Sequence, residues 1–599
     1  MSRRTRRLPL PANAIGVGAG MQRDDDAVTP AQAPVLLGAY AAKQCPVRVQ
    51  NDFLPMVSTL KWEPSSEEQA RLDAGNAFEA GVFAVLAAIH PTAVVVDPQL
   101  GKADAIALTV HAMDAASPLI LGGWLPDDVE DGRTGKPDIL VRVDRGYVPA
   151  DVKNHLTVKR AKVKHIQVSP LSSPEERWQV PGWTATGHYY EDGLQLAHYT
   201  RMLQACGYHP GPDRLWAAVV GTSRLETPLA GAAEFVFVWH DLDDPVRFTF
   251  SRARGKVRRS LLERYDHEHA FRVKVADTAR QITGAAYDPQ PLVEPVGQDE
   301  CQKCPYERWC AEQMGPDDPS TAINVGGLNT REWLTLRRLG VSTTAALSVV
   351  DPDDPQFFDE YFAEVTHLTR DQARKRLLGA VERAGMICEG VEIARAGAGS
   401  VTVPVADVEI DLDIEWDIEN RVYMWGARVR RDGDESTARY VADFVEWDPL
   451  DSPREQALAG RFAAWLRAQR EAADAAGRTL KVFHWSQPER SRLISILGLA
   501  EVADLVNPDT GIFIDVEKLF KANFVSLHGS SIKKVAPYFG FAWRVDDPGG
   551  AISQTYLSAV HGGADPDGVA RAKEWLLSYN EDDNAAVARI RDGMSTWTA

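Results

Sequence analysis

The sequence predicts an α/β protein of several domains, and three features of the chain support this fold class. Its 599 residues exceed the size that one hydrophobic core usually serves, and the length favours about three to five domains. Helical periodicity over residues 65–91 is followed by short β-type runs, and a strand-rich stretch over 401–445 is followed by helical segments. Hydrophobic residues make up 44% of the chain and charged residues 25%, as in globular proteins.

The first predicted domain begins with a helix. Ser65 and Glu68 form a capping-box pattern, apolar residues at helical spacing follow, and His90-Pro91 ends the pattern. The next runs are rich in β-type residues and are separated by Gly and Pro, which predicts strands and hairpins over 93–97, 119–125, 137–143 and 146–153. Residues 195–208 return to a helical period. We therefore expect one domain over 34–315, preceded by a flexible tail over 1–33.

Two further domains are predicted in the second half of the chain. Residues 316–396 pair a Gly-Gly turn with two short helical patterns separated by LGVST, as helix-hairpin-helix units do. After the AGAGS joint the strand-like runs VTVPVADVEIDLDIEW, RVYMWGARV and RYVADFV precede helical segments. This order predicts a second α/β domain over 397–599.

The charge and hydropathy of the chain argue against several classes of protein. The net charge is −18, which argues against a surface that is basic throughout, although residues 153–165 and 252–264 are locally basic. We find no apolar run long enough to span a bilayer and no Walker A loop. We expect a soluble cytoplasmic protein that has no membrane contact and no motor of its own.

Four of the six cysteines form a pattern typical of a metal or cluster site. Cys301, Cys304 and Cys310 follow the spacing C-x2-C-x5-C, and Cys45 lies far upstream. Such a set is too sparse for a disulfide framework, but it supplies the four thiolates that an iron–sulfur cluster or a structural zinc requires. Either group would join the two ends of one domain. Cys206 and Cys388 are interpreted as ordinary small hydrophobic residues.

A first set of chemical residues lies between these cysteines. Asp138 is in one predicted strand, and Asp151 and Lys153 form a D-x-K pattern in the next. Residues i and i+2 of a strand share a face, and a hairpin would bring Asp138 alongside them. Two carboxylates can hold Mg²⁺ or Mn²⁺ for phosphodiester hydrolysis, and Lys153 would steady the attacking water or the developing charge. The alternative is an exposed strand with an incidental ion pair.

This set resembles the PD-(D/E)xK nucleases of the RecB type over nearly the whole first domain. The matching motifs are, in order, a helical Glu, G-x-x-D, D-x-K and Q-x-x-x-Y, here Glu79, Gly135 with Asp138, Asp151 with Lys153, and Gln195 with Tyr199. Iron–sulfur members of that family, such as AddB-like subunits, place one cysteine before the nuclease core and three after it. The resemblance implies a restriction-endonuclease-like core and a structural [4Fe–4S] cluster on Cys45, Cys301, Cys304 and Cys310, with zinc as the alternative.

A second set of chemical residues lies in the last domain. Asp413 and Glu415 end a β-type run, and Tyr579 and Asp583 are one turn apart on a predicted helix. This D-x-E and Y-x3-D pattern resembles the DEDD exonucleases of the ribonuclease-H-like fold, which hold two metal ions between such carboxylates. The middle motif departs from that family, because only Glu489, with His484 nearby, is available as a ligand. An inactive or weakened second site is the alternative.

The tandem order resembles a family of bacterial RecB-like nucleases along most of the chain. The resemblance implies a Mg²⁺- or Mn²⁺-dependent nuclease that hydrolyses DNA single strands or ends in repair, recombination or defence, with a helicase or repair complex as partner. One alternative is a nucleic-acid-binding or scaffolding subunit with one or both sites inactive, and another is an RNA-processing nuclease.

Overall fold

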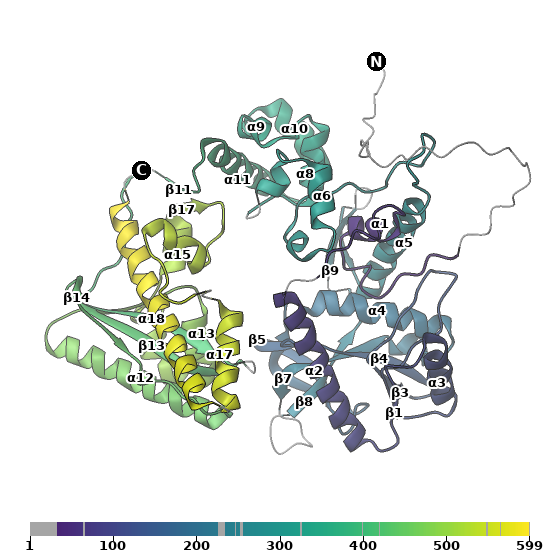
Figure 1. The fold of residues 1–599 in the computed structure, drawn as a ribbon, viewed down its shortest axis with the longest axis horizontal. Coiled ribbons are helices and arrows are strands. Elements are labelled where there is room, and N and C mark those ends of the chain that lie inside the picture. The colour runs from purple at the N-terminus through teal and green to yellow at the C-terminus, as the bar shows by residue number, and fades with distance from the viewer. Residues whose placement is uncertain are drawn as a thin grey trace, which may run out of the picture. The chain divides into compact units, whose positions relative to one another are not determined.

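The computed structural model (Figure 1) describes residues 33–63, 66–225, 234–245, 247–251, 255–323, 326–397, 399–417, 420–546, 549–563 and 565–597. Of the predicted tail, residues 1–32 lie outside this set. The chain divides into two compact units: unit 1 runs to Pro316 and includes Phe362–Arg370, and unit 2 comprises Asp317–Tyr361 and Asp371–Ala599. The finer predicted boundaries at 34, 315 and 396 stay predictions.

Unit 1 contains a mixed eight-stranded sheet with the order β1-β2-β3-β4-β7-β8-β5-β6. Its strands are β1 (Val94–Val95), β2 (Leu119–Leu121), β3 (Ile139–Val143), β4 (Gly146–Val152), β5 (Val158–Pro170), β6 (Trp178–Ala185), β7 (Trp216–Leu225) and β8 (Glu234–Asp241). The predicted hairpin forms β3 and β4, which pair antiparallel, and β4 pairs parallel with β7. A separate hairpin consists of β9 (Arg247–Ser251) and β10 (Gly255–Arg259).

Helices cover both faces of this sheet. The helices of unit 1 are α1 (Pro46–Phe53), α2 (Ser66–Ile89), α3 (Lys102–Asp114), α4 (Tyr189–Ala205), α5 (Leu261–Ala279) and α6 (Glu307–Met314), with short 3-10 turns η1 (Pro212–Arg214) and η2 (Asp299–Lys303). Of these, α2 to α5 pack on the sheet. Ile139 and Val141 of β3 pack with α2, whereas Leu140 packs with α3 and α4. Because side chains alternate along a strand, α2 and α4 lie on opposite faces.

Helix α2 contradicts the prediction that the chain has no apolar run long enough to span a bilayer. Its segment Arg71–Ile89 is long and apolar enough to cross a membrane by length and composition alone, and 11% of it is buried. The prediction that no run reaches this length is therefore wrong by that criterion. Core helices of other proteins meet the same criterion, so it assigns no membrane role.

Unit 2 contains a five-stranded sheet with the order β14-β13-β12-β15-β16. Its strands are β12 (Val408–Trp416), β13 (Val422–Arg431), β14 (Asp434–Val441), β15 (Leu480–His484) and β16 (Phe513–Asp515). The central strand β12 pairs antiparallel with β13 and parallel with β15. A two-stranded ribbon joins β11 (Ile393–Arg395) to β17 (Phe524–Ser526).

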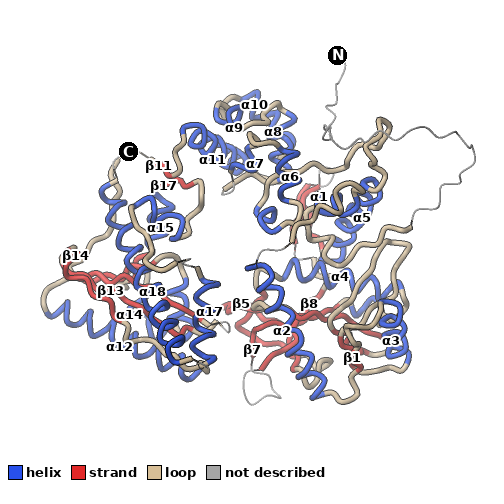
Figure 2. Tube along the Cα trace, viewed as in Figure 1, coloured by secondary structure: helices blue, strands red, loops and turns tan. Residues whose placement is uncertain are grey.

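The two faces of β12 have different chemistry. Val408, Ile410, Leu412 and Ile414 enter a core with α12 (Ser452–Ala475), whereas the intervening acidic residues face α18 (Pro566–Thr596). Figure 2 distinguishes the sheet strands, in red, from these two helices, in blue. Alternation along the strand thus gives the sheet an apolar face toward α12 and an acidic face toward α18.

The other helices in this half of the chain precede the sheet, lie between β15 and β16, or follow β16, and α10 ends in the segment assigned to unit 1. They are α7 (Pro319–Ala322), α8 (Thr330–Arg338), α9 (Thr344–Ser348), α10 (Pro355–Glu364), α11 (Arg370–Glu389), α13 (Pro488–Leu497), α14 (Leu499–Val506), α15 (Val516–Asn523), α16 (Ile532–Val535), η3 (Ala536–Phe539) and α17 (Gly550–Gly562). Helices α8 and α9 flank the LGVST sequence, as the pattern predicts. The chain is a mixed α/β protein, as the sequence predicts; the two named fold families stay predictions.

Candidate functional site

In unit 1 the β3–β4 hairpin brings Asp138 and Asp151 together. Ile139 is opposite Ala150, so Asp138, the residue before β3, is opposite Asp151. The backbone N–H of Val152 donates a hydrogen bond to Asp138 Oδ2 over 2.7 Å. Both carboxylates lie on the sheet face that α4 covers, and Asp151 is fully buried.

Lys153 is the cation of this site. Its Nζ lies 2.5 Å from Asp151 Oδ2. Burial lowers the pKa of Lys153, but the charges of Asp151, Tyr40 and Asp138 outweigh burial, and the net pKa is raised. Burial and the charge of Asp151 raise the pKa of Asp138 well above its usual value. Lys153 therefore interacts with two adjacent carboxyl groups.

Helix α4 adds the Q-x-x-x-Y residues to the same face. Gln195 Nε2 donates to the Tyr199 hydroxyl over 3.4 Å. Burial raises the pKa of Tyr199, and the charges of Asp151 and Asp138 raise it further. A Cβ on Gly135 would lie 2.8 Å from Tyr199 Cε1, so a glycine is needed for this close approach. The structure thus places Gly135, Gln195 and Tyr199 beside the two aspartates.

Glu79 is less closely associated with the pair. It lies on α2, on the opposite side of the sheet from α4, and is half-buried. Burial raises its pKa, Lys136 lowers it, and Asp151 raises it, so the two carboxylates interact electrostatically. Among the described residues of unit 1, no three carboxylate, imidazole or thiol groups lie within 4.8 Å of one another.

Sequence reasoning missed Lys43 at this site. Lys43 Nζ donates to Gln195 Oε1 over 3.1 Å and lies 4.3 Å from the centre of the Tyr40 ring. Burial and the charge of Lys153 lower the pKa of Lys43. Lys43 lies in a stretch without regular periodicity, so no local pattern marks it. The fold brings it to Gln195 across 152 positions of sequence.

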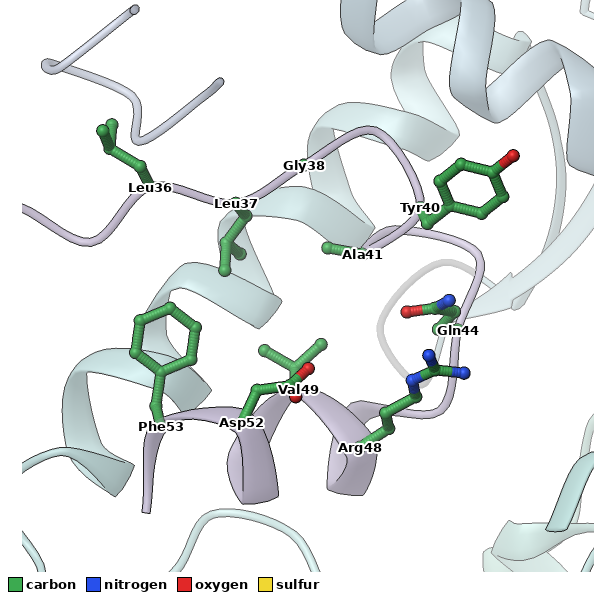
Figure 3. Close-up of a pocket in the computed structure, with 10 residues that line it drawn as sticks. All are labelled: Leu36, Leu37, Gly38, Tyr40, Ala41, Gln44, Arg48, Val49, Asp52 and Phe53. Carbon is green, nitrogen blue, oxygen red and sulfur yellow. The ribbon is translucent and has the colours of Figure 1, made fainter. Parts of the chain in front are cut away.

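A cavity lies next to this site rather than at its carboxylates. It has a volume of about 510 Å³ and is lined by Leu36, Leu37, Gly38, Tyr40, Ala41, Gln44, Arg48, Val49, Asp52 and Phe53. Figure 3 shows that α1 supplies Arg48, Val49 and Asp52; Val49 points toward Leu37 and Ala41, and Arg48 points toward Gln44. Tyr40 connects the cavity to the site, because its ring centre lies 5.9 Å from Lys153 Nζ.

The four predicted cluster cysteines gather at one end of unit 1. Cys45 precedes α1, Cys301 and Cys304 lie in and after η2, and Cys310 lies in α6. Asn51 Nδ2 lies 3.4 Å from Cys310 Sγ. The pKa values of Cys45 and Cys310 are raised to about 12, mainly by burial and in part by the charge of Cys301. The thiols therefore share one largely apolar environment.

The spacing of these sulfurs bears on which group they fit. In this part of the described chain, no three of the four sulfurs lie within 4.8 Å of one another. Tetrahedral zinc, with Zn–S bonds of about 2.3 Å, would place its sulfurs about 3.8 Å apart. Zinc would thus require the cysteines to move closer together. A structural zinc and a [4Fe–4S] cluster both take four thiolates, so the number of cysteines does not separate them.

In unit 2 the second predicted set of residues forms a compact acidic group. Ligand oxygens of Asp413, Glu415 and Asp583 all lie within 4.8 Å of one another. Asp413 and Glu415 project from the acidic face of β12, and Asp583 projects from α18. This group is the metal-type cluster that the described residues contain, and it joins three of the predicted ligands.

The pKa values of these three carboxyl groups are raised. For Asp413 burial is the main cause, followed by the charges of Asp583, Glu415 and Glu489. Burial and Asp583 raise the pKa of Glu415 to about 8. Burial also raises the pKa of Asp583, although Lys533 opposes it. Three buried carboxylates repel one another, and a divalent cation with oxygen ligands would relieve this repulsion.

Asn580 fixes the orientation of Asp413. Its Nδ2 donates to Asp413 Oδ2 over 2.8 Å, and its Oδ1 accepts from the Tyr440 hydroxyl over 2.8 Å. A Cβ on Gly426, opposite Asp413 in the sheet, would lie 1.5 Å from Asn580 Oδ1. Gly426 therefore makes room for the amide. Sequence reasoning missed Asn580, although it is the neighbour of Tyr579 and could have been suspected from that position.

Lys533, Trp543 and Tyr579 surround Asp583. Lys533 Nζ forms an ion pair with Asp583 Oδ1, and Trp543 Nε1 donates to the same oxygen over 2.7 Å. Tyr579 also hydrogen-bonds to Asp583, and burial together with the charge of Asp583 raises its pKa. The phenol is therefore protonated at neutral pH. No sequence motif marks Lys533 or Trp543.

The predicted middle ligand Glu489 lies outside the compact group. It is buried at the start of α13, and its Oε2 lies 3.3 Å from His484 Nδ1. Burial raises its pKa and the hydrogen bond to His484 lowers it. The charge of Glu489 raises the pKa of Asp413, but the oxygens of Glu489 are not within 4.8 Å of all three carboxylates.

The remaining acidic residues of β12 have arginine partners. Glu409 Oε2 accepts from Arg430 over 2.6 Å and from Arg591 over 3.0 Å. Asp411 Oδ1 lies 3.4 Å from Arg591 Nη2, and Asp411 Oδ2 lies 3.7 Å from Arg428 Nη1. Of the four carboxylates on one strand face, two are thus neutralised by guanidinium groups, and Asp413 and Glu415 are left for another cation.

Comparisons with known proteins give little further information. No protein-family model and no curated protein match the chain. One solved structure is described as "3'-end specific recognition of histone mRNA stem-loop by 3'-exonuclease"; it is 10% identical, the match covers 44% of this chain and 87% of that one, and the TM-score is 0.20. A likeness of this degree carries no argument about the present chain.

Proposed function

We propose that the chain is a metal-dependent nuclease that hydrolyses phosphodiester bonds. The observation that carries this proposal is the group of Asp413, Glu415 and Asp583, whose oxygens lie within 4.8 Å of one another on a sheet and a helix. Buried carboxylates at this spacing suit Mg²⁺ or Mn²⁺. A D-x-E on the central strand and a Y-x3-D on the last helix also support the ribonuclease-H-like fold that the sequence predicts.

The residues of unit 2 have separable roles in this chemistry. Asp413, Glu415 and Asp583 would hold the ion, which supplies activation of water and neutralisation of phosphate charge. Asn580 keeps Asp413 oriented through its 2.8 Å hydrogen bond. Tyr579 keeps its proton, because burial and nearby carboxylates raise its pKa. It can therefore orient a water by hydrogen bonding, but it is not a general base at neutral pH.

Unit 1 supports a second hydrolytic site of the RecB type. Asp138 and Asp151 would hold a metal ion there. Nearby negative charges outweigh the effect of burial and raise the pKa of Lys153, so Lys153 would remain cationic beside the phosphate. We further propose a structural [4Fe–4S] cluster on the four gathered cysteines, with zinc as the alternative. Its loss would affect folding before chemistry, because cluster binding and folding are coupled.

Nucleic acid as the substrate is supported by the β9–β10 hairpin. Phe248 is 54% exposed, and Lys256 Nζ and Arg258 Cζ lie 4.7 Å and 4.9 Å from its ring centre. An exposed aromatic ring beside cations is suited to stack a base and attract its phosphate. We propose DNA, in single strands or at ends, as the preferred substrate, and a helicase or repair complex as partner.

The test is hydrolysis of labelled substrates by the full chain with Mg²⁺ or Mn²⁺. Asp413→Asn and Lys153→Met are expected to lower the activity of their own sites by about 100-fold or more, since each removes a charge that stabilises the reacting phosphate. The exposed residues Glu471 and Lys164 provide matched controls, as Glu471→Gln and Lys164→Met. Unchanged activity in both test variants would refute the proposal.

The same assay separates the alternatives. A panel of single-stranded DNA, blunt duplex DNA and RNA of equal length distinguishes a DNA nuclease from an RNA-processing enzyme. Tight binding of DNA without hydrolysis in either metal would instead indicate a binding or scaffolding subunit. Phe248→Ala is expected to weaken single-strand binding, because stacking contributes about 1–3 kcal/mol per base.

A further inference from the structure

A lysine lies inside the acidic group of unit 2. Lys533 is on the short helix α16, and its ammonium forms an ion pair with Asp583 Oδ1, 50 positions away in sequence. The same oxygen accepts a hydrogen bond from Trp543 Nε1 over 2.7 Å. Asp583 Oδ1 thus already has two donors, whereas no donor from these two residues reaches Oδ2. Lys533 and Trp543 therefore both hold the carboxylate of Asp583 through Oδ1.

Two aromatic rings hold the ammonium in place. Lys533 Nζ lies 4.2 Å from the centre of the Tyr579 ring and 4.6 Å from that of Trp543. Trp575 in turn stacks on the Tyr579 ring, and the two ring centres lie 5.0 Å apart. Cation–π attraction at partly desolvated sites is strong enough to fix the position of a lysine. Lys533 is thus a fixed charge of the site.

The charges of the group indicate how many cations it needs. Lys533 lowers the pKa of Asp413, Glu415 and Asp583. Burial outweighs it at Asp583, and burial together with the neighbouring carboxylates outweighs it at Asp413 and Glu415. Three ionised carboxylates and one ammonium leave two negative charges, which one divalent ion neutralises. A second divalent ion would bring positive charge close to Lys533 and would be repelled.

We propose that Lys533 is a built-in cation that takes the place of a second metal ion, so that the site binds one divalent ion. This inference rests on the proposed function of the site. It also explains why Glu489 is not needed as a metal ligand: Glu489 pairs with His484 and stays outside the compact group. Lys533 positions Asp583, and its charge would be available to a phosphate oxygen of the substrate.

The test is a titration of the full chain with Mn²⁺, with bound ions counted by electron paramagnetic resonance. Because unit 1 could also bind Mn²⁺, the count for the unit 2 site is the difference between each protein and its Asp413→Asn counterpart. We expect one ion for the wild type and two for Lys533→Met, with the first ion bound about tenfold or more tightly in the variant. Lys534→Met, at the exposed neighbouring lysine, is the matched control and should keep one ion.

Two results would overturn the inference: a difference of two ions in the wild type, or an unchanged count and affinity in Lys533→Met. Lys533→Arg keeps the charge and should keep one ion, and it decides the case if Lys533→Met does not fold as judged by circular dichroism. The count does not depend on turnover. A wild type that binds one ion but hydrolyses no substrate would refute the proposed function and leave the inference about Lys533 standing.

Discussion

Replacing Gly426 by alanine tests whether Asn580 holds the acidic face of β12 in place. The new Cβ would lie 1.5 Å from Asn580 Oδ1, and Asn580 is fully buried, so the amide would have to leave its position. Its hydrogen bond to the carboxylate of Asp413 would be lost, at about 1.5–3 kcal/mol, as would the bond from Tyr440, at about 0.5–1.5 kcal/mol. Overpacking adds about 1–3 kcal/mol. We expect Gly426→Ala to destabilise this part of unit 2 by about 4 kcal/mol.

Hydrogen exchange measured by mass spectrometry on peptides from β12 and β13 is the appropriate assay, because it reports local opening in the full chain. A loss of about 4 kcal/mol corresponds to about 1,000-fold faster exchange. Gly460→Ala, on α12 with nothing within 4 Å of the new Cβ, is the control and should leave exchange unchanged or slower.

A double-mutant cycle isolates the contact between the two residues. Asn580→Ala removes the hydrogen bonds with Asp413 and Tyr440, together with the one from Asn584 Nδ2, and also opens space for a Cβ at position 426. In that background Gly426→Ala should cost only about 1 kcal/mol, because the Tyr440 hydroxyl remains 2.9 Å from the new Cβ. Equal costs in both backgrounds, or a cost below about 1 kcal/mol in the wild type, would refute the role assigned to Asn580.

Three further predictions concern stability. Cys301→Ser is expected to abolish cluster absorbance and lower the melting temperature of unit 1, and Cys388→Ser, at an exposed position, to change neither. Identical melting curves for the two variants would contradict a structural role of the cluster. Burial lowers the pKa of His240 to about 4, so the unfolded chain binds the extra proton and stability is lost as the pH falls from about 6.5 to 4. His240→Phe should reduce the slope of the unfolding free energy against pH in this range by about 1.4 kcal/mol per pH unit. An unchanged slope, measured by urea denaturation at several pH values, would disprove this. Arg591→Met should lower the free energy of unfolding by about 3 kcal/mol, because it leaves buried Asp411 without its nearest cation. Adding Asp411→Asn should restore more than half of the lost stability, and no recovery would refute the idea that Arg591 neutralises Asp411.

Local patterns predict the elements that carry the site residues. The alternation of VEIDLDIEW places all four acidic residues on one face of a strand, and this is where β12 has them. The D-x-K pattern and its preceding Asp138 likewise predict a hairpin, which β3 and β4 form. Such features depend on residues a few positions apart, so the sequence alone expresses them.

The sequence does not reveal which carboxylates are neutralised within the protein. Arg591, 182 positions from Glu409, pairs with two acids of β12, whereas Lys533 approaches Asp583 from another helix. Glu489 shows the same limit: the sequence makes it a candidate ligand, but the fold places it against His484. Lys43 joins the unit 1 site from a segment with no recognisable pattern.

The sequence by itself therefore determined the α/β class, the strand faces and the set of acidic residues and cysteines that could act. These follow from periodicity and spacing, which are properties of neighbouring residues. Only the tertiary structure decided that Asp413, Glu415 and Asp583 form one compact group, and that Lys533 and Asn580 complete it. The physical reason is that charge balance and close packing depend on distances in space between residues far apart in the chain.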